Sequence, residues 1–330
     1  MKFRNLIFII SIILFNNFCK PQDINTAGIS GSIVYTNVAT INNKIVRAIK
    51  VFNLDSKTEQ VFPTDDFIFG GASVSKDGVI AQLFDRGRDQ VVIQINKLNG
   101  AFVKSFVYDE PYSFANSGAR ISPDGSLVAF SLTVQLGAGK SESRVYFCGT
   151  GSDNRCFYYS NLGDPEWMPD GRLIAVNVFS NSERGGLYVT QKAIKAGNTT
   201  PTNVVRLGPE NLNNASNPMV TSDGTTVILA LGIKQNIYAL NITNNEVKQI
   251  TKDGLQQYDP YVSTDGKFLF YTQQCCPKNG NAVAAGPALH SISLNVNIAN
   301  STPLSEYYLT DKNGKTINPN SRYGYTTKTL

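Results

Sequence analysis

The sequence predicts an all-β fold built from one repeated unit, and three observations support this prediction. The dipeptide Asp-Gly recurs at intervals of 47, 46, 53 and 42 residues, at Asp77, Asp124, Asp170, Asp223 and Asp265. The residues around the dipeptide recur in register, which is far more specific than an isolated Asp-Gly. Apolar runs rich in β-branched and aromatic residues follow each dipeptide, and they are too short to be helices.

Each repeat predicts a short strand, a tight turn and a second strand that runs back. An apolar residue stands three positions before each Asp: Val74, Ile121, Trp167, Val220 and Val262. In such turns the glycine takes positive φ at no steric cost. The chain then returns through apolar runs such as residues 127–130, 173–176, 227–229 and 268–271.

Third and fourth strands complete the unit. Candidates for the third strand are residues 91–95, 145–147, 187–189, 237–240 and 292–294, and residues 204–207 and 247–251 are candidates for the fourth. Four antiparallel strands in a unit of roughly 40 to 50 residues are typical of a β-propeller blade.

The repeat extends in both directions. A step of 47 residues back from Gly78 reaches Gly31, where residues 29–35 form a degenerate copy. The tail at 315–330 is too short for a seventh unit, and we expect residues 323–326 to add a strand to the first one. The sequence therefore predicts a single six-bladed propeller over 28–330 whose first blade is closed by the C-terminal tail, so that no sheet edge is left open at the seam.

These repeats resemble the TolB-type propeller repeat, with its hallmark Pro-x-apolar-Ser-Pro-Asp-Gly followed by an apolar strand. Residues 121–130 and 165–176 match it most closely, and the resemblance covers about residues 28–310. The first repeat lacks the Asp, and the second lacks one residue after Gly78. We expect neither the α/β domain that precedes the TolB propeller nor the hydrolase domain of prolyl-oligopeptidase-like enzymes. The resemblance thus implies a stand-alone propeller and no particular activity.

The N-terminus has the pattern of an export signal. Lys2 and Arg4 precede an apolar run at 6–15, which as a helix would span about 15 Å, roughly half of a bilayer core. Cys19 follows directly and resembles the cysteine of a bacterial lipoprotein signal, which implies lipidation, a signal peptide at 1–18 and a tether at 19–27. Phe18 and Asn16 depart from the usual pattern, so an ordinary secretory signal is the alternative.

The remaining cysteines suit an oxidising compartment. Cys148 and Cys156 flank a Gly/Asp/Asn turn, so we expect a disulfide that staples a hairpin. Cys275 and Cys276 are adjacent in the sequence. They either form a vicinal disulfide or remain two free thiols, and both alternatives stay open. None of the spacings is a zinc pattern.

Composition excludes several classes of function. The net charge is +5, with 17% charged residues and no basic cluster, which gives no electrostatic basis for binding nucleic acid. The single histidine, His290, rules out a multi-histidine metal site, and we expect it to be structural. We expect the repeated Asp side chains to bond to their own turns rather than to calcium. Residues 137–141 echo a phosphate loop but lack its spacing and its helix.

The best candidates for binding lie just before each turn. By analogy with the family, Ser73, Arg120, Glu166, Met219 and Tyr261 lie on the innermost strands near the channel mouth. Arg120, Glu166 and Tyr261 are the three that could hold a polar ligand. Two long connections, 132–143 and 272–289, are the candidates for a partner-specific surface.

Together these observations predict a non-enzymatic, monomeric lipoprotein of a bacterial cell envelope, anchored in the bilayer through Cys19, that binds a protein or peptide. We expect no catalytic residue, no metal and no cofactor. Two alternatives remain open: an outward-facing adhesin for host extracellular-matrix proteins, and a calcium-dependent hydrolase of lactonase type. Whether the protein faces the periplasm or the exterior is also open.

Overall fold

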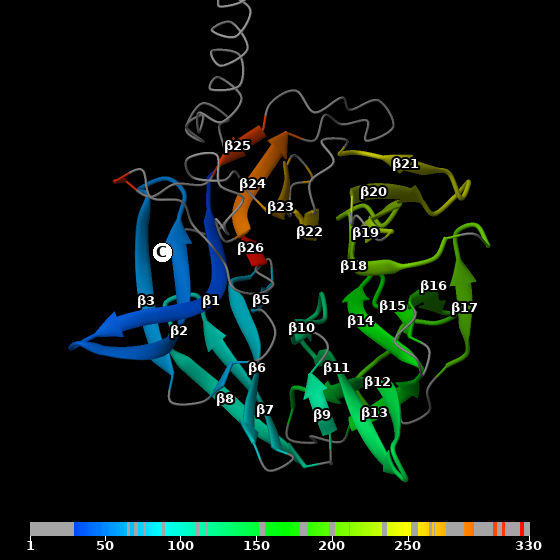
Figure 1. Cartoon of the computed structure of the whole chain (residues 1–330), viewed down its shortest axis with the longest axis horizontal. Helices are drawn as coiled ribbons and strands as arrows, with labels where there is room; N and C mark the ends of the chain where they lie inside the picture. The colour runs from blue at the N-terminus through cyan, green and yellow to red at the C-terminus, as the bar shows by residue number, and fades with distance from the viewer. Residues whose placement is uncertain are drawn as a thin grey trace, which may run out of the picture.

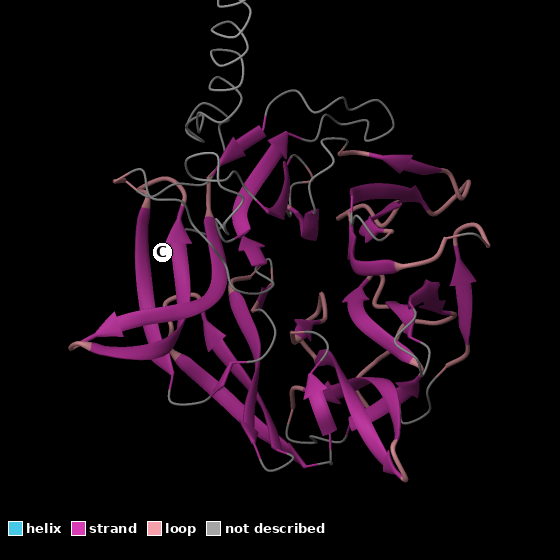
Figure 2. Ribbon diagram, in the orientation of Figure 1, coloured by secondary structure: helices cyan, strands magenta, loops and turns pink. Residues whose placement is uncertain are grey.

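The computed structural model describes residues 30–64, 67–68, 72–75, 77–87, 90–109, 112–115, 118–151, 156–178, 184–197, 202–210, 212–232, 236–251, 257–263, 266, 268–274, 287–293, 306–308, 312–313 and 324–326. This part of the chain consists of strands, turns and loops without a helix (Figure 2), which confirms the all-β prediction. Over the same residues, no helix has the length and apolar character to cross a membrane. The expected signal peptide and Cys19 lie outside the described residues.

The strands form six hydrogen-bonded sheets arranged around a common centre (Figure 1). Sheet 1 has the order β26-β1-β2-β3, with β1 (Ser32–Ile41), β2 (Lys44–Asn53), β3 (Thr58–Thr64) and β26 (Gly324–Thr326). Sheet 2 contains β4 (Phe67–Ile68), β5 (Ser73–Val74), β6 (Val79–Gly87), β7 (Gln90–Lys97) and β8 (Phe102–Asp109). Sheet 3 contains β9 (Tyr112–Ala115), β10 (Arg120–Ile121), β11 (Leu127–Gly137), β12 (Lys140–Gly149) and β13 (Cys156–Ser160).

The other three sheets repeat the same simple order of consecutive antiparallel strands. Sheet 4 is β14 (Leu162–Trp167), β15 (Leu173–Val178), β16 (Arg184–Thr190) and β17 (Val204–Leu207). Sheet 5 is β18 (Ala215–Val220), β19 (Thr226–Leu231), β20 (Asn236–Asn241) and β21 (Val247–Gln249). Sheet 6 is β22 (Gln257–Val262), β23 (Phe268–Gln274), β24 (Pro287–Ser293) and β25 (Glu306–Tyr308).

Sheet 1 is assembled from the two ends of the chain. Strand β26 pairs antiparallel with β1, with Ser32 opposite Thr326 and Val34 opposite Gly324. Strand β1 therefore occupies the place that the second strand has in the other sheets, as the alignment of Gly31 with Gly78 predicts. The strand paired with β1 on its other edge, β26, comes from the C-terminal tail.

The Asp-Gly turns link the two inner strands of sheets 2 to 6. In sheet 3 the Gly125 N–H donates to the Ser122 carbonyl (2.9 Å), and the Ser122 N–H donates to the Leu127 carbonyl (2.8 Å). Gly125 has φ of 73°, and the four equivalent glycines have φ between 71° and 83°. The turn in sheet 2 is one residue shorter, as predicted. The turn in sheet 4 is also one residue shorter, since the Met168 N–H donates to the Arg172 carbonyl. This shorter turn was not predicted.

Side chains of the turns close the same loops. The Asp124 carboxylate accepts from the Ser122 hydroxyl (2.6 Å) and from the Ser126 N–H (3.0 Å). Asp223 accepts from the Thr221 hydroxyl (2.6 Å) and from the Thr225 N–H (3.1 Å). The Asp carboxylates of these turns are thus engaged locally, as expected.

Three inner strands contain the same β-bulge. Asp164, Asn217 and Asp259 each precede a proline and have φ of 47°, 51° and 53°. The register shifts across each of them, for example between Gly163 and Glu166. Asp and Asn tolerate this left-handed conformation better than other residues with a Cβ atom. The Asn217 N–H also donates to the Asp164 carboxylate (3.3 Å), which joins the inner strands of sheets 4 and 5.

Apolar clusters fill the space between successive sheets. In β11, Val128 and Phe130 pack toward sheet 2, whereas Leu127 and Ala129 pack toward sheet 4. Both faces of this second strand are therefore buried. Trp167, which is 5% exposed, packs between sheets 3 and 4, so the apolar position of this repeat lies in the core.

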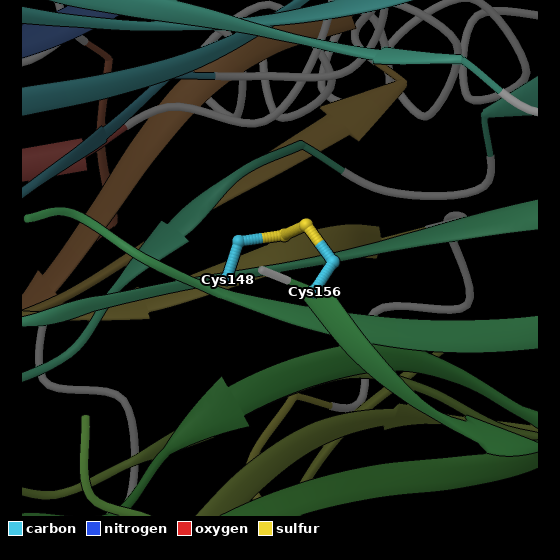
Figure 3. Close-up of a disulfide and its surroundings, with 2 residues drawn as sticks. All are labelled: Cys148 and Cys156. Atoms are coloured by element: carbon cyan, nitrogen blue, oxygen red, sulfur yellow. A yellow bond between two sulfur atoms is a disulfide. The ribbon is translucent and has the colours of Figure 1, made fainter. Parts of the chain in front are cut away.

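Cys148 and Cys156 form a disulfide between β12 and β13 (Figure 3). The two residues are directly opposite each other in the strand pair. The bridge staples the hairpin that the sequence predicts at this turn. Cys275 and Cys276 lie outside the described residues.

We expect replacement of both bridged cysteines, Cys148→Ser with Cys156→Ser, to lower the free energy of unfolding by about 2 kcal/mol, because the bridge closes only a short loop. Urea denaturation of the oxidised wild type and of the double variant measures this difference. Reduction of the wild type should give a similar loss. A larger effect in the variant than in the reduced wild type would mean that the serines themselves disturb the hairpin.

We expect the turns in sheets 3 and 5 to make folding sensitive to acid. Burial alone would raise the pKa of Asp124, but hydrogen bonds from Ser122 and Ser126 outweigh it and lower that pKa. The pKa of Asp223 is lowered in the same way, by Thr221 and Thr225 against the opposing effect of burial. Because both pKa values are depressed in the folded state, their contribution is present above the unfolded pKa of about 4 and is lost as pH falls through the folded value.

The variant Asp124→Asn with Asp223→Asn should therefore be less stable than the wild type near neutral pH and should approach it at about pH 2. Urea midpoints at the two pH values test this. An equal difference at both values would show that the lowered pKa values do not contribute to stability.

Candidate functional site

The innermost strands of five sheets each carry one candidate side chain at the same position. This position is the penultimate residue of the strand: Ser73 of β5, Arg120 of β10, Glu166 of β14, Met219 of β18 and Tyr261 of β22. The inner strands surround the centre of the ring (Figure 1), so the predicted placement on innermost strands is correct. The apolar last residue of the strand packs toward the preceding sheet, as Trp167 and Val262 do. Because side chains alternate along a strand, the penultimate residue is directed toward the following sheet.

Arg120 and Glu166 meet in a buried ion pair. Arg120 Nε lies 3.0 Å from Glu166 Oε2, and the two side chains are only 7% and 10% exposed. The contact is ionic rather than a well-aligned hydrogen bond. A second carboxylate oxygen, Glu166 Oε1, accepts the N–H of Trp167 (2.9 Å), and the Trp167 indole N–H donates to the Arg120 carbonyl (2.9 Å). The backbone and the indole thus hold both partners in place.

Arg120 retains a donor that the described residues do not use. Its Nη1 is buried and has no hydrogen-bond partner in the described part of the chain. An unpaired buried guanidinium N–H favours an acceptor such as a carbonyl or a carboxylate.

Tyr261 is a third polar residue on an innermost strand. Its hydroxyl donates to the carbonyl of Val74 on β5 (3.4 Å). Strands β22 and β5 belong to sheets 6 and 2, and both contact β26, which lies between them. The hydrogen bond therefore connects inner strands that flank sheet 1.

The structure brings Arg120 and Glu166 together and places Tyr261 at the same strand position. All three residues are buried, with 6%, 8% and 6% exposure. They are therefore less open to solvent than their expected place at a channel mouth suggests. Chemically the group offers hydrogen-bond donors and one compensated pair of charges, which suits recognition of a polar ligand.

The other sequence candidates fall into three groups. The segment 137–141 is the tip of the hairpin between β11 and β12, followed by a strand, so it is no phosphate loop. Of the connection 272–289, the ends belong to β23 and β24 and residues 275–286 lie outside the described part. His290 is on β24 opposite Tyr271, and its side chain is not described. Among the described residues, no three His, Cys, Asp or Glu side chains are grouped to hold a metal ion.

One polar cluster was not predicted from the sequence. On β12 the Arg144 Nε donates to Glu142 (2.6 Å), and the guanidinium lies 4.3 Å from the centre of the Tyr158 ring. Burial alone would lower the pKa of Arg144, but hydrogen bonds to Tyr146 and Glu142 raise it. The sequence pattern that indicates this cluster is the alternation of Glu142, Arg144 and Tyr146, because it places all three residues on one face of a strand.

A second unpredicted feature is an apolar outer strand. On β8, Phe102, Val103 and Val107 are 61%, 47% and 46% exposed. Strand β8 pairs only with β7, so its other edge is not covered by a described strand. Such an edge can accept another strand.

Comparison with known proteins gives matches at the level of three-dimensional structure only. No protein-family model matches the chain, and no curated protein matches it. TolB from Acinetobacter baumannii aligns with a TM-score of 0.60 and 15% identity, over 96% of this chain and 71% of that chain. A putative TolB from Agrobacterium tumefaciens aligns with a TM-score of 0.56 and 16% identity, over 88% of this chain and 97% of that one.

A chain from a nidogen/laminin complex is also similar, with a TM-score of 0.55 and 13% identity over 90% of this chain and 99% of that one. At such identities a likeness establishes the fold and not the activity. The ring of antiparallel sheets and these similarities show that the chain has the fold of a TolB-like β-propeller.

Proposed function

We propose that this protein is a non-enzymatic scaffold, anchored by a lipid at Cys19 in a bacterial cell envelope, which binds a protein or a peptide segment. The observation that carries the proposal is the buried pair of Arg120 and Glu166 on innermost strands, where Tyr261 occupies the equivalent strand position. These groups form hydrogen bonds and ion pairs, which suits the recognition of a polypeptide. The TolB-like fold and the lipoprotein-type leader support the cellular location.

The proposal includes the architecture of the ring. We propose that the six sheets are six blades and that β26 closes the ring by completing the first of them. The antiparallel pairing of β26 with β1 supports this closure. A closed ring is rigid and has no open seam, which suits a scaffold that holds a partner.

Arg120 would make the primary contact with the ligand. Its free Nη1 can donate to a backbone carbonyl or a carboxylate of the bound segment. Because Glu166 already balances the charge of Arg120, the bound group need not be anionic. The ligand must reach a buried layer, so we expect a narrow extended segment rather than a broad surface.

Two alternatives have distinct experimental outcomes. An outward-facing adhesin would bind host extracellular-matrix proteins and would be cleaved by protease added to intact cells. A calcium-dependent hydrolase of lactonase type would need carboxylates that converge on one ion, whereas Asp124 and Asp223 each accept hydrogen bonds within their own turns. Tight calcium binding by calorimetry, together with turnover of a lactone or ester, would replace the scaffold with the enzyme.

The anchor is tested by the variant Cys19→Ala. We expect the wild type to incorporate labelled palmitate and to sediment with membranes, because the lipid on Cys19 would hold the protein in the bilayer. The variant should lose the label and move to the soluble fraction. A wild type without label would refute lipidation and leave an ordinary secretory signal.

The binding site is tested by crosslinking in cells with a photoreactive phenylalanine analogue at one of two positions. Met219 occupies the same penultimate position on its inner strand as Arg120 and Glu166 do on theirs, and we call these residues the inner layer. Leu136, by contrast, is 52% exposed at the tip of the β11–β12 hairpin. If the inner layer binds the partner, the analogue at Met219 should capture an envelope protein. Replacement of Arg120, Glu166 and Tyr261 together by Ala should then abolish that capture.

The triple variant removes both charges for a physical reason. Loss of Arg120 alone would leave Glu166 buried without its partner, which costs about 3–5 kcal/mol and could unfold the ring. Circular dichroism and the urea midpoint must show that the triple variant is folded. Capture that survives the triple change but is lost on deletion of residues 279–286 would move the site to the last-sheet connection.

A further inference from the structure

The Asp-Gly turns and the loops between the third and fourth strands lie on one face of the ring. In sheet 3 the Thr150 N–H donates to the Ser126 carbonyl (2.8 Å), and the Thr150 hydroxyl donates to the Gly125 carbonyl (2.6 Å). The equivalent bond in sheet 4 joins Ile194 to Gly171 (2.9 Å), and in sheet 5 it joins Ile242 to Thr225 (2.9 Å). We call this side the turn face.

The hairpins between second and third strands end on the opposite face. Each second strand leaves its Asp-Gly turn and crosses the sheet before it turns back. This holds for the hairpin at Gly137–Lys140 between β11 and β12, and for the connection between β23 and β24. The described ends of both connections that the sequence marks as candidates for partner contact are therefore on this side, which we call the hairpin face.

The N-terminal segment joins the ring on the turn face. Gly31 is buried at the start of β1, where its N–H donates to the Asp55 carboxylate (3.1 Å). Its carbonyl accepts the N–H of Leu54 (2.9 Å). Leu54 and Asp55 belong to the turn between β2 and β3, which is the third-to-fourth strand loop of sheet 1. Two hydrogen bonds therefore fix the point at which the tether meets the ring.

Only a fully extended tether could carry its anchor to the other face. Eleven peptide units separate residues 19 and 30, so the chain between them spans about 40 Å at most, and about 20 Å as a flexible coil. Strand β1 has 10 residues. A path to the hairpin face would run about 30 Å along such a strand and a further 10 Å, roughly, past β2 and β3. It would therefore use the whole extended length of the tether, whereas a tether with the dimensions of a coil keeps its anchor near the turn face.

We propose that the turn face is directed toward the membrane and that the hairpin face is directed away from it. This inference rests on the proposed lipid anchor and deepens it, because it assigns a direction to the ring. It also places the layer of Arg120, Glu166 and Tyr261 near the membrane side, since these residues directly precede the turns. The hairpin face then becomes the first surface that an approaching protein meets.

The chemistry of the turn face indicates that the tether, and not attraction to lipid, sets this orientation. Exposed charged residues of both signs lie on its loops, among them Asp55, Asp77, Lys97, Asp170, Lys192 and Lys195. Mixed charge gives no net attraction to an anionic bilayer. We therefore expect the orientation to be the same in low and high salt.

Energy transfer to a lipid-bound acceptor tests the orientation. The protein begins at residue 19, with an acyl chain ligated chemically to its N-terminus, in phosphatidylcholine vesicles that carry a rhodamine lipid. A donor dye is attached through an azide-bearing lysine analogue at Lys195, an exposed loop residue on the turn face, or at Lys140, the exposed first residue of β12 at the tip of a hairpin on the hairpin face. We expect at least about twofold more efficient transfer from position 195, because the two faces are about 30 Å apart. Equal or reversed efficiencies would overturn the proposal.

Further measurements separate orientation from other effects. Ser56 and Asn43 form a second pair on sheet 1 and must show the same order, which rules out a simple tilt. A flexible insertion of about 20 residues after residue 20 should abolish the difference, because the longer tether reaches either face. Because the acyl chain is attached chemically, failure of natural lipidation in cells would leave this result unchanged, so the two proposals fail separately.

Discussion

Burial of both faces of the second strand in each sheet is the constraint on which the other features depend. In β11 successive side chains pack alternately toward sheet 2 and toward sheet 4. A slip of one residue between inner strands would exchange these faces and move every side chain to the wrong neighbour. The Asp-Gly turn prevents this slip, because its backbone hydrogen bonds and the positive φ of its glycine fix the pairing of the two strands.

The same packing explains why a charged pair can lie near the centre. The last residue of each inner strand fills the space toward the preceding sheet and must be apolar. The penultimate residue is directed the other way and is free to vary, as Ser73, Met219 and Tyr261 show. Arg120 and Glu166 occupy this position in consecutive sheets, where each compensates the charge of the other. Burial without that compensation would cost several kcal/mol, so the pair is constrained to change together.

Much of the fold followed from the sequence because the repeat marks the turns. The turn pattern located the inner strands, Trp167 in the core and the hairpin stapled by Cys148 and Cys156. The bulges at Asp164, Asn217 and Asp259 did not follow, since Asp-Pro and Asn-Pro also occur in ordinary turns. The contact of Arg120 with Glu166 joins residues in different repeats, and repeats alone do not give the distance between neighbouring strands. The Arg144 cluster was missed because periodicity was used to find strands and not to compare their faces.

The two faces of the ring differ in how much the chain can change there. On the turn face, backbone and side-chain groups of each Asp-Gly turn bond to one another or to the adjacent loop, and the turns of sheets 2 to 6 differ in length by only one residue. On the hairpin face, only the hairpin tip must be closed, as in the short turn at Asn42 and Asn43, and the ends of β23 and β24 on this face are separated in sequence by residues 275–286. Insertions there leave the register of the inner strands intact, and loop closure entropy rises only slowly with length. The chain can therefore acquire new contact surface on this face at little cost in stability, which is where a scaffold tethered by the opposite face needs it.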